Sequence, residues 1–183
     1  SRRLEKLIDE LFEITRMNYG MLKIDKTRID LSELLVQLNE EIYPALEKNN
    51  LETRLHVVPN VTIQGDGELL ARVFENLLPN AIRYGKDGKH IDIHCRPDQE
   101  EAIVQVINYG HSIPPEDLPH VFDMFYTGDK ARTQREQGSG IGLFIAKNLV
   151  EQHAGTITAQ SDPIRTMFEV RLPLNPAAEG TDR

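Results

Sequence analysis

The chain has 183 residues, of which 39% are hydrophobic and 27% charged, enough for one well-buried globular domain with a helical appendage. Its formal net charge of -8 argues against a nucleic-acid-binding surface, because phosphate binding depends on an excess of Lys and Arg. A single cysteine, Cys95, excludes an internal disulfide, and no apolar run approaches the length of a bilayer-spanning helix, so we expect a soluble domain.

The first segment, from Arg2 to about Lys23, is predicted to form one helix. Spacings of three and four residues, the pattern of a heptad seam, separate Leu4, Leu7, Leu11, Ile14, Asn18 and Met21. This pattern fits a helix that pairs with a second helix. It fits equally well an amphipathic helix that lies on its own domain, and the sequence leaves both interpretations open.

The rest of the chain predicts a mixed α/β domain. Asp30 followed by Glu33 resembles a capping box, which would begin a helix that runs to about Asn50. Further helices are expected at Glu68–Tyr84 and Ile141–His153, and strands at Leu51–Val58, Val61–Gln64, Ile91–Arg96, Ala102–Ile107, Thr156–Ser161 and Thr166–Leu172. A turn is expected at Pro97-Asp98. The simplest architecture is a two-layer α/β sandwich with helices on one face of a mixed sheet.

The predicted helix Glu68–Tyr84 carries the most informative polar residues. Asn76, Asn80 and Arg83 share one helical face, and Tyr84 lies one turn beyond Asn80. Asparagine lowers helix stability at interior positions, so two on one face indicate a surface kept for binding. An amide oxygen suits Mg²⁺, an arginine suits phosphate and a tyrosine can stack on a flat ring. Taken alone, the asparagine pair would more often be a solvated helix face.

Two glycine-containing segments add weaker signals. Segment 108–114 directly follows a predicted strand, so a polar side chain there could reach a ligand above the sheet, although alone it fits an ordinary loop. Segment 138–143 begins a helix, and its three glycines would let phosphate approach the free N–H groups of the helix start. The loop before it contains the basic residues Lys130, Arg132 and Arg135. It fits neither a Walker loop nor a dinucleotide-binding fingerprint.

The order of these segments resembles the conserved boxes of the histidine-kinase ATPase family, part of the GHKL superfamily. The boxes are the Asn76–Asn80 helix, 108–114, Phe122–Phe125, 138–143 and Thr166–Phe168. The resemblance implies a Bergerat-type ATPase fold, with an ATP-binding catalytic domain at 29–174. It further implies that residues 1–25 are the second helix of a dimerisation hairpin, and that 175–183 are a frayed tail. A finer similarity at Asp30–Tyr43 resembles the vancomycin-resistance sensor branch.

Carried over residue by residue, the resemblance implies a site for ATP and Mg²⁺. Asn76 and Asn80 would face Mg²⁺ and phosphate, and Asn80 and Arg83 would be the catalytic pair. Tyr84 would border the nucleoside, and Asn108 would receive the adenine amino group. The other implied nucleotide contacts are Gly110, Ser112, Ile113, Phe125, Lys130, Arg132, Gly138, Gly140, Ile141, Gly142, Leu143 and Thr166. Thr127–Gln137 would be a mobile lid, with Phe122 and Phe125 packed at its root.

Three residues depart from the family pattern. Asn108 stands where the family usually has Asp, and its amide can turn and donate to a guanine oxygen, which a carboxylate would repel. We therefore predict weaker discrimination between ATP and GTP than an Asn108→Asp variant would show. Ser112 replaces a common glycine. Pro79 lies in the middle of a helix, where it removes a backbone hydrogen bond and can introduce a kink.

The function implied is transfer of the γ-phosphoryl group of ATP to a histidine in a two-component system. Related gyrase-type ATPases carry a Glu base where this chain has Asn76, and Glu75 is expected to point about 100° away, which disfavours hydrolysis. None of the six histidines stands in the family's acceptor setting, so the acceptor is expected on a hairpin helix outside this chain.

The implied partners are that phosphoacceptor hairpin, a cognate response regulator and a second copy bound through the N-terminal helix. The chain would then be a cytoplasmic domain of a membrane-anchored parent. The competing hypothesis is a degenerate nucleotide-binding module that acts in signalling or dimerisation without catalysis. Asn108, Ser112 and Pro79 are its support.

Overall fold

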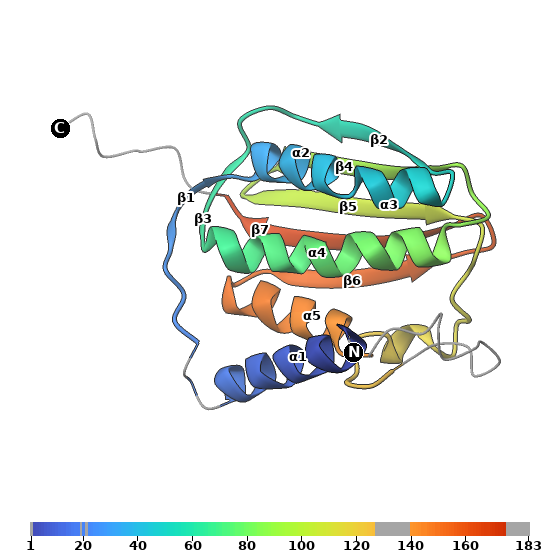
Figure 1. Ribbon diagram of the computed structural model, residues 1–183. Helices are drawn as coiled ribbons and strands as arrows, with labels where there is room; N and C mark the ends of the chain where they lie inside the picture. The colour runs from blue at the N-terminus through green and yellow to red at the C-terminus, as the bar shows by residue number, and fades with distance from the viewer. Residues whose placement is uncertain (1, 19, 21, 127–139, 175–183) are drawn as a thin grey trace.

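A mixed five-stranded sheet with helices on one face forms the centre of the computed structural model, which describes residues 2–18, 20, 22–126 and 140–174 (Figure 1). The elements are α1 (Arg2–Asn18), β1 (Thr27–Asp30), α2 (Leu31–Glu41), α3 (Tyr43–Lys48), β2 (Glu52–Val57), β3 (Thr62–Gly65), α4 (Gly67–Tyr84), β4 (His90–Asp98), β5 (Glu101–Tyr109), the 3-10 helix η1 (Leu118–His120), α5 (Gly142–Gln152), β6 (Thr156–Ser161) and β7 (Arg165–Pro173). No helix in these described ranges combines the length and the apolar character needed to cross a bilayer.

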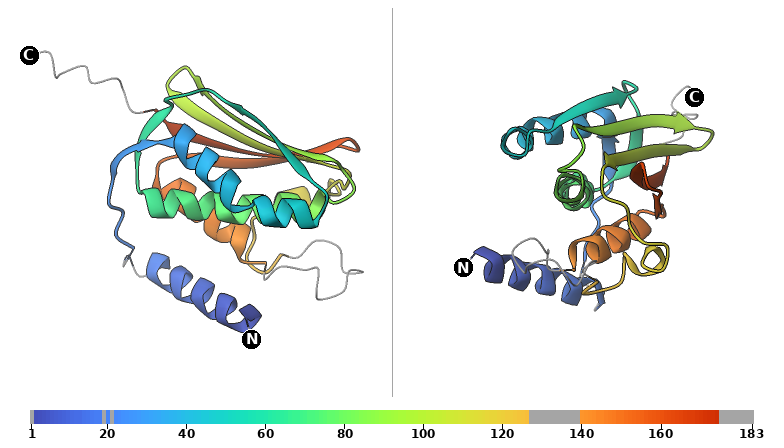
Figure 2. Two further views of the ribbon diagram at one scale, coloured as in Figure 1. Left: turned by 45° about the horizontal axis from the view of Figure 1, so that its top comes forward. Right: turned by 90° about the vertical axis from the view of Figure 1, so that its right-hand side faces the viewer.

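The large sheet has the strand order β2-β4-β5-β7-β6. Strands β2 and β4 are parallel, and the other neighbours are antiparallel. Strands β1 and β3 form a separate antiparallel pair. Helices α2, α4 and α5 lie on the same face of the large sheet, as the end-on view makes clear (Figure 2). The predicted two-layer α/β sandwich is therefore confirmed.

Helix α4 fills the centre of the helical layer. Its fully or nearly fully buried apolar residues are Leu70, Val73, Phe74, Leu77, Leu78, Ala81 and Ile82. The helix begins at Asp66, whose carboxylate accepts hydrogen bonds from the backbone N–H groups of Glu68 and Leu69. Buried His153, just after α5, accepts the Asp66 N–H at Nε2 (3.0 Å) and donates from Nδ1 to Leu149 (2.7 Å). This imidazole therefore joins the start of α4 to the end of α5.

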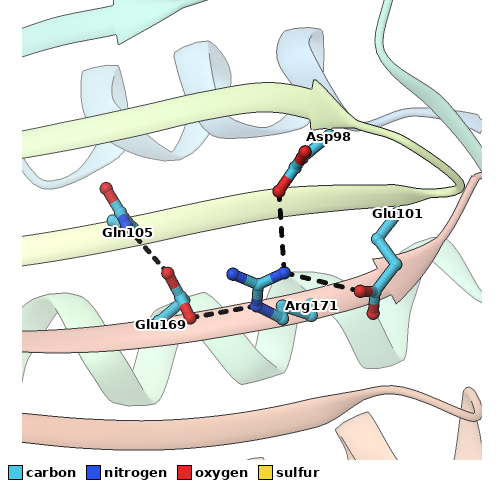
Figure 3. Close-up of polar contacts among 5 residues, drawn as sticks. All are labelled: Asp98, Glu101, Gln105, Glu169 and Arg171. Atoms are coloured by element: carbon cyan, nitrogen blue, oxygen red, sulfur yellow. Dashed lines mark hydrogen bonds and ion pairs between the residues drawn. The ribbon is translucent and has the colours of Figure 1, made fainter.

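Among the described residues no helix covers the opposite face of the sheet, where acidic and basic side chains pair with one another. Arg171 lies between three carboxylates, with contacts of 3.0 Å to Glu169, 3.4 Å to Glu101 and 3.8 Å to Asp98 (Figure 3). Gln105 donates to the second oxygen of Glu169 (2.8 Å). Burial alone would raise the pKa of Glu169, but its hydrogen bonds from Gln105 and Arg171 hold that pKa below its usual value.

A second cluster on this face joins three strands. Arg54 on β2 makes a bidentate ion pair with Asp92 on β4, at 2.5 and 2.8 Å, and the hydroxyl of Tyr109 on β5 donates to the same carboxylate. Burial pushes the pKa of Asp92 upward, but the bonds from Arg54 and Tyr109 outweigh it, so the pKa lies below its usual value. His94, two residues along β4, stacks on His56 with ring centroids 4.5 Å apart.

The predicted helix from Asp30 to Asn50 is wrong as a single element. Asp30 does cap it, accepting from the Glu33 N–H at 3.0 Å, but the helix is interrupted at Ile42 and continues as α3. Pro44 fits this interruption, because it lacks the N–H that would bond the carbonyl four residues earlier and lies in the first turn of α3, where that N–H is not needed.

Two other boundaries also differ from the predictions. Pro97 and Asp98 belong to β4, and the hairpin turns at Gln99 and Glu100, with Gln99 at φ 55°. Strand β2 extends only to the position opposite Cys95, so Pro97 has one neighbouring strand and its missing N–H is tolerated. The first helix ends at Asn18, earlier than predicted, and Gly20 takes φ 65°.

Helix α1 lies against its own domain, and the face it buries overlaps the predicted seam only at Leu7 and Ile14. Glu10 and Ile14 are buried, and Leu7 and Met17 pack partly against the core. Glu13 pairs with Arg72 on α4. A stripe of large apolar side chains stays exposed, formed by Leu4, Ile8, Leu11 and Phe12. The second interpretation of the N-terminal segment thus describes its contacts here, while the exposed stripe leaves room for a further helix.

We predict that Asp92→Asn lowers the free energy of unfolding at pH 7 by about 1–3 kcal/mol, near the lower end because Arg54 is 49% exposed. The pKa of Asp92 is lower in the folded than in the unfolded chain. The carboxylate therefore stabilises the fold above about pH 4 and loses this effect as acid protonates it. Urea unfolding at pH 7 and pH 3 should show the difference between the two proteins shrinking in acid. The same difference at both pH values would contradict the assignment.

Candidate functional site

A cavity of about 370 Å³ opens between α1, the C-terminal half of α4, the start of α5 and the loop that follows β5. Its wall contains ten residues that the sequence singled out: Asn76, Asn80, Arg83, Tyr84, Ser112, Ile113, Gly140, Gly142, Leu143 and Thr166. Segments far apart in the sequence therefore meet here as the ordered boxes implied.

The polar face predicted on α4 lines one side of the cavity. Asn80 is only 9% exposed although it is polar, and Asn76, Arg83 and Tyr84 are half-buried beside it. The helix continues through Pro79 from Gly67 to Tyr84. Pro79 and Glu75 also line the wall, so the cavity extends around α4 as far as Glu75, which was expected to lie away from the site. This part of α4 thus brings amide, carboxylate and guanidinium groups to the cavity wall.

The amide of Asn76 is oriented by its own helix. Its Nδ2 donates to the carbonyl of Arg72 at 3.0 Å, which turns Oδ1 toward the start of α5. There, a Cβ added to Gly142 would lie 2.8 Å from that oxygen, so glycine is what leaves it room. The arrangement gives the cavity an oxygen acceptor directly beside a helix start, where the first backbone N–H groups have no partner within the helix and favour an anion.

A chain of hydrogen bonds holds the loop after β5 against the sheet. The Ile113 N–H donates to Ser161 Oγ (2.8 Å), and Ser161 Oγ lies 2.7 Å from Thr166 Oγ1, which in turn bonds to the carbonyl of His111 (3.2 Å). The His111 ring stacks on Tyr84, with centroids 6.0 Å apart and planes 17° from parallel. The loop, β6, β7 and α4 are therefore held in one arrangement around this end of the cavity.

The residues on either side of segment 127–139 are bonded to each other. Phe125 has φ 65° and donates its N–H to the Gly140 carbonyl at 2.7 Å. Gly140 has φ 75°, and a Cβ there would lie 2.7 Å from the Phe125 backbone. Phe122 packs edge-on against Phe168 (5.9 Å) with Lys147 over its ring (5.6 Å), whereas the Phe125 side chain is 58% exposed. Phe125 therefore contributes its backbone to this junction.

Several predicted contacts are not in the cavity wall. Gly110, Phe125 and Ile141 lie outside it, and Ile141 is fully buried at the start of α5. Asn108 is not a wall residue either: it is 1% exposed and lies beside the wall residue Thr166, its partner in the β5–β7 register. The predicted contacts Lys130, Arg132 and Gly138, with the rest of the proposed lid, lie outside the described residues, as does the predicted tail at 175–183.

The wall also contains residues that the sequence analysis did not select: Lys6, Glu10, Glu75, Pro79, His111, Pro114, Asp117, Val121, Tyr126 and Phe168. His111 and Pro114 lie inside a segment that had been singled out, so a wider selection would have included them. Lys6 and Glu10 come from α1, and no local pattern predicts that this helix reaches the site. A smaller charged cavity of about 270 Å³ continues between α1 and α4, lined partly by Glu13 and Arg72.

Tyr126 is the wall residue whose titration is most clearly altered. Burial, together with the nearby carboxyl of Asp117, raises its pKa to about 12. The phenol therefore stays protonated at neutral pH and acts as a hydrogen-bond donor at the edge of the cavity.

Comparisons with known proteins show the family to which the chain belongs. Residues 65–176 match the family described as "Histidine kinase-, DNA gyrase B-, and HSP90-like ATPase". The sensor protein VanS of Enterococcus faecium is 42% identical over 174 residues, which are 95% of this chain and 45% of that protein. The sensor protein SrrB of Staphylococcus aureus is 34% identical over 174 residues, 94% of this chain and 30% of that protein. This chain thus spans less than half the length of either relative.

The solved structure of the histidine kinase AdeS from Acinetobacter baumannii has the same fold, with a TM-score of 0.79 at 19% identity over 94% of this chain and 79% of that one. The fold and the site define an ATPase domain of the mixed α/β type. The chain belongs to the histidine kinase-, DNA gyrase B- and HSP90-like ATPase family, and the resemblance inferred from the ordered boxes is confirmed. The assignment to the vancomycin-resistance sensor branch stays a prediction.

We predict that Gly140→Ala lowers the free energy of unfolding by about 1–3 kcal/mol, because a side chain at φ 75° is strained and its Cβ meets the backbone of Phe125. Gly142→Ala is the matched control. Its Cβ would meet only the end of the Asn76 side chain, which can turn away, so stability should change by less than about 0.5 kcal/mol. Chemical denaturation measures both, and an equal loss in the two variants would contradict this account.

Proposed function

We propose that this chain binds Mg²⁺–ATP in the cavity and donates the γ-phosphoryl group to a histidine on a separate helical hairpin, as the catalytic domain of a sensor histidine kinase. The observation that carries the proposal is the wall made by Asn76, Asn80 and Arg83 opposite the glycine-flanked start of α5, in a member of this ATPase family. The proposal assigns the nucleotide base to the end near Tyr84 and the phosphates to the end near Asn76 and Gly142.

The residues present suit a magnesium ion that is coordinated partly by the protein and partly by phosphate oxygens of the nucleotide. Within the described ranges, no group of three or more His, Cys, Asp or Glu is placed to hold a metal by itself. Asn76 and Asn80 would supply amide oxygens, which are hard ligands of the kind Mg²⁺ accepts. When bound, the ion would neutralise charge on the transferring phosphoryl group. The half-buried Arg83 adds a fixed positive charge on the same wall.

The start of α5 supports binding of the phosphates. Its first turn carries free N–H groups and the positive end of the helix dipole, both of which favour an anion. Gly140 and Gly142 have no side chains to block close approach, and both line the cavity. Transfer then depends on holding the phosphoryl group in line with an incoming imidazole, which is a matter of position and charge.

Helix α1 supports the second half of the proposal. Its exposed stripe of Leu4, Ile8, Leu11 and Phe12 is a large apolar surface on one side of a helix that is already anchored on the other. Such a surface favours burial against further helices. We propose that residues 1–25 are the second helix of the phosphoacceptor hairpin, that a second copy joins through it, and that the hairpin passes phosphate to a response regulator. The parent would be membrane-anchored, with this domain in the cytoplasm.

Calorimetric titration with Mg²⁺ and a non-hydrolysable ATP analogue tests binding. We expect Asn80→Ala to weaken the analogue at least about tenfold, which corresponds to 1.4 kcal/mol. Asn49→Ala is the matched control: the side chain of this asparagine, at the end of α3, donates to the Ala45 carbonyl, and Asn49 does not line the cavity, so its replacement should leave affinity unchanged. Equal affinity in wild type and Asn80→Ala would place the nucleotide elsewhere.

Labelling with radioactive ATP tests the transfer step. The chain alone should remain unlabelled, and a supplied hairpin domain carrying an acceptor histidine should become labelled. Release of inorganic phosphate is measured in parallel, because Glu75 in the wall is the group that would act as base in hydrolysis. Binding without any transfer would favour the non-catalytic signalling module, and strong labelling of any of the chain's own six histidines would contradict an external acceptor.

A further inference from the structure

The side-chain amide of Asn108 is buried beside the cavity wall and has no hydrogen-bond partner among the described residues. It is 1% exposed, and both its Oδ1 and its Nδ2 lack such a partner. A buried polar group without a partner is unfavourable and uncommon in folded proteins, and a ligand can supply the missing bonds. Its stem is closely packed, since a Cβ added to Gly85 would lie 3.0 Å from the Asn108 Cβ. The position of the amide is therefore fixed, but its orientation is not.

The neighbouring hydroxyl groups have already used their protons. Ser161 Oγ accepts from the Ile113 N–H, and Thr166 donates to the His111 carbonyl, so the proton between the two hydroxyls belongs to Ser161. Thr166 stands directly across from Asn108 in the β5–β7 ladder. Neither hydroxyl therefore has a proton left for a ligand or for the Asn108 amide. Among these three side chains, Asn108 alone can still donate and accept.

We propose that the Asn108 amide forms hydrogen bonds with the C6 and N1 positions of a purine base, whichever of the two positions is the donor. The site would then bind 6-oxopurine as well as 6-aminopurine nucleoside triphosphates. This inference rests on the proposed nucleotide function. Adenine presents an amino donor at C6 and an acceptor at N1, whereas hypoxanthine and guanine present an acceptor at C6 and a donor at N1. An amide carries one acceptor and one donor side by side, and half a turn about χ2 exchanges them.

The half turn costs no hydrogen bond here, because no described group holds the amide in one orientation. A site that hydrogen-bonds its substrate normally rejects an analogue with the wrong donors, because its own buried groups are then left unpaired. Asn108 avoids that penalty by turning. A carboxylate in the same place could accept from an adenine amine but would face the carbonyl of a 6-oxopurine with a negative charge. The identity of this one residue thus sets the base specificity.

Inosine triphosphate is the sharpest probe, since it reverses the donor and acceptor of adenine without adding the 2-amino group of guanine. Titrated with Mg²⁺ against the wild-type chain, it should bind within about tenfold of ATP, a difference of at most 1.4 kcal/mol. Asn108→Asp should raise the ratio of the two dissociation constants at least about tenfold in favour of ATP. Thermal melting of the variant shows whether it is folded, and if it is not, the wild-type ratio decides alone.

The outcomes separate this inference from the function on which it rests. Suppose that ATP binds the wild-type chain, that Asn80→Ala abolishes this binding, and that inosine triphosphate binds the wild type more than about a hundredfold more weakly than ATP. The inference is then overturned and the proposed function stands. An unchanged ratio in a folded Asn108→Asp variant would also overturn it. If neither nucleotide binds the wild-type chain, the proposed function itself is wrong.

Discussion

Helix α4 has to satisfy two demands at once, and the rest of the structure depends on how it does so. One side buries a continuous row of apolar residues against the sheet, and the other presents Asn76, Asn80 and Arg83 to the cavity. Rotation of the helix would bury polar groups and expose apolar ones, so the core itself fixes which residues face the ligand. Asp66 and His153 set where the helix begins, and the same imidazole holds the end of α5. The two helices, which both line the cavity, are thereby held together.

The remaining parts of the site are placed by contacts between segments distant in sequence. The hydroxyls of Ser161 and Thr166 hold the loop after β5, and the Phe125–Gly140 bond joins the residues on either side of 127–139. Helix α1 adds Lys6 and Glu10 from the far end of the chain. A movement of α1 would therefore change the shape of the cavity directly, because this helix forms part of its wall. On the open face of the sheet, by contrast, the acidic and basic side chains of neighbouring strands form ion pairs with one another.

Much of the site could be predicted from the sequence because its residues lie in short, ordered segments. Asn76, Asn80, Arg83 and Tyr84 were correctly placed on one face, since helical periodicity alone determines which side chains lie together. The prediction was less successful where neighbours decide the outcome. Glu75 was expected to point away, yet the cavity is wide enough around α4 to include it. The role given to each residue toward nucleotide and metal remains a proposal, because residue position alone does not show a ligand.

The sequence by itself determined the alternation of helices and strands, the cap at Asp30 and the family, because these depend on local periodicity, turn chemistry and ordered motifs. Only the tertiary structure decided which face of α1 is buried, since Leu7, Glu10 and Ile14 pack according to the surface that α4 and α5 present. It also decided that Asn108 is buried beside the wall residue Thr166, with no hydrogen-bond partner for its amide among the described residues. A pattern along the chain records what a residue can do, but burial and hydrogen bonding depend on neighbours that are distant in the sequence.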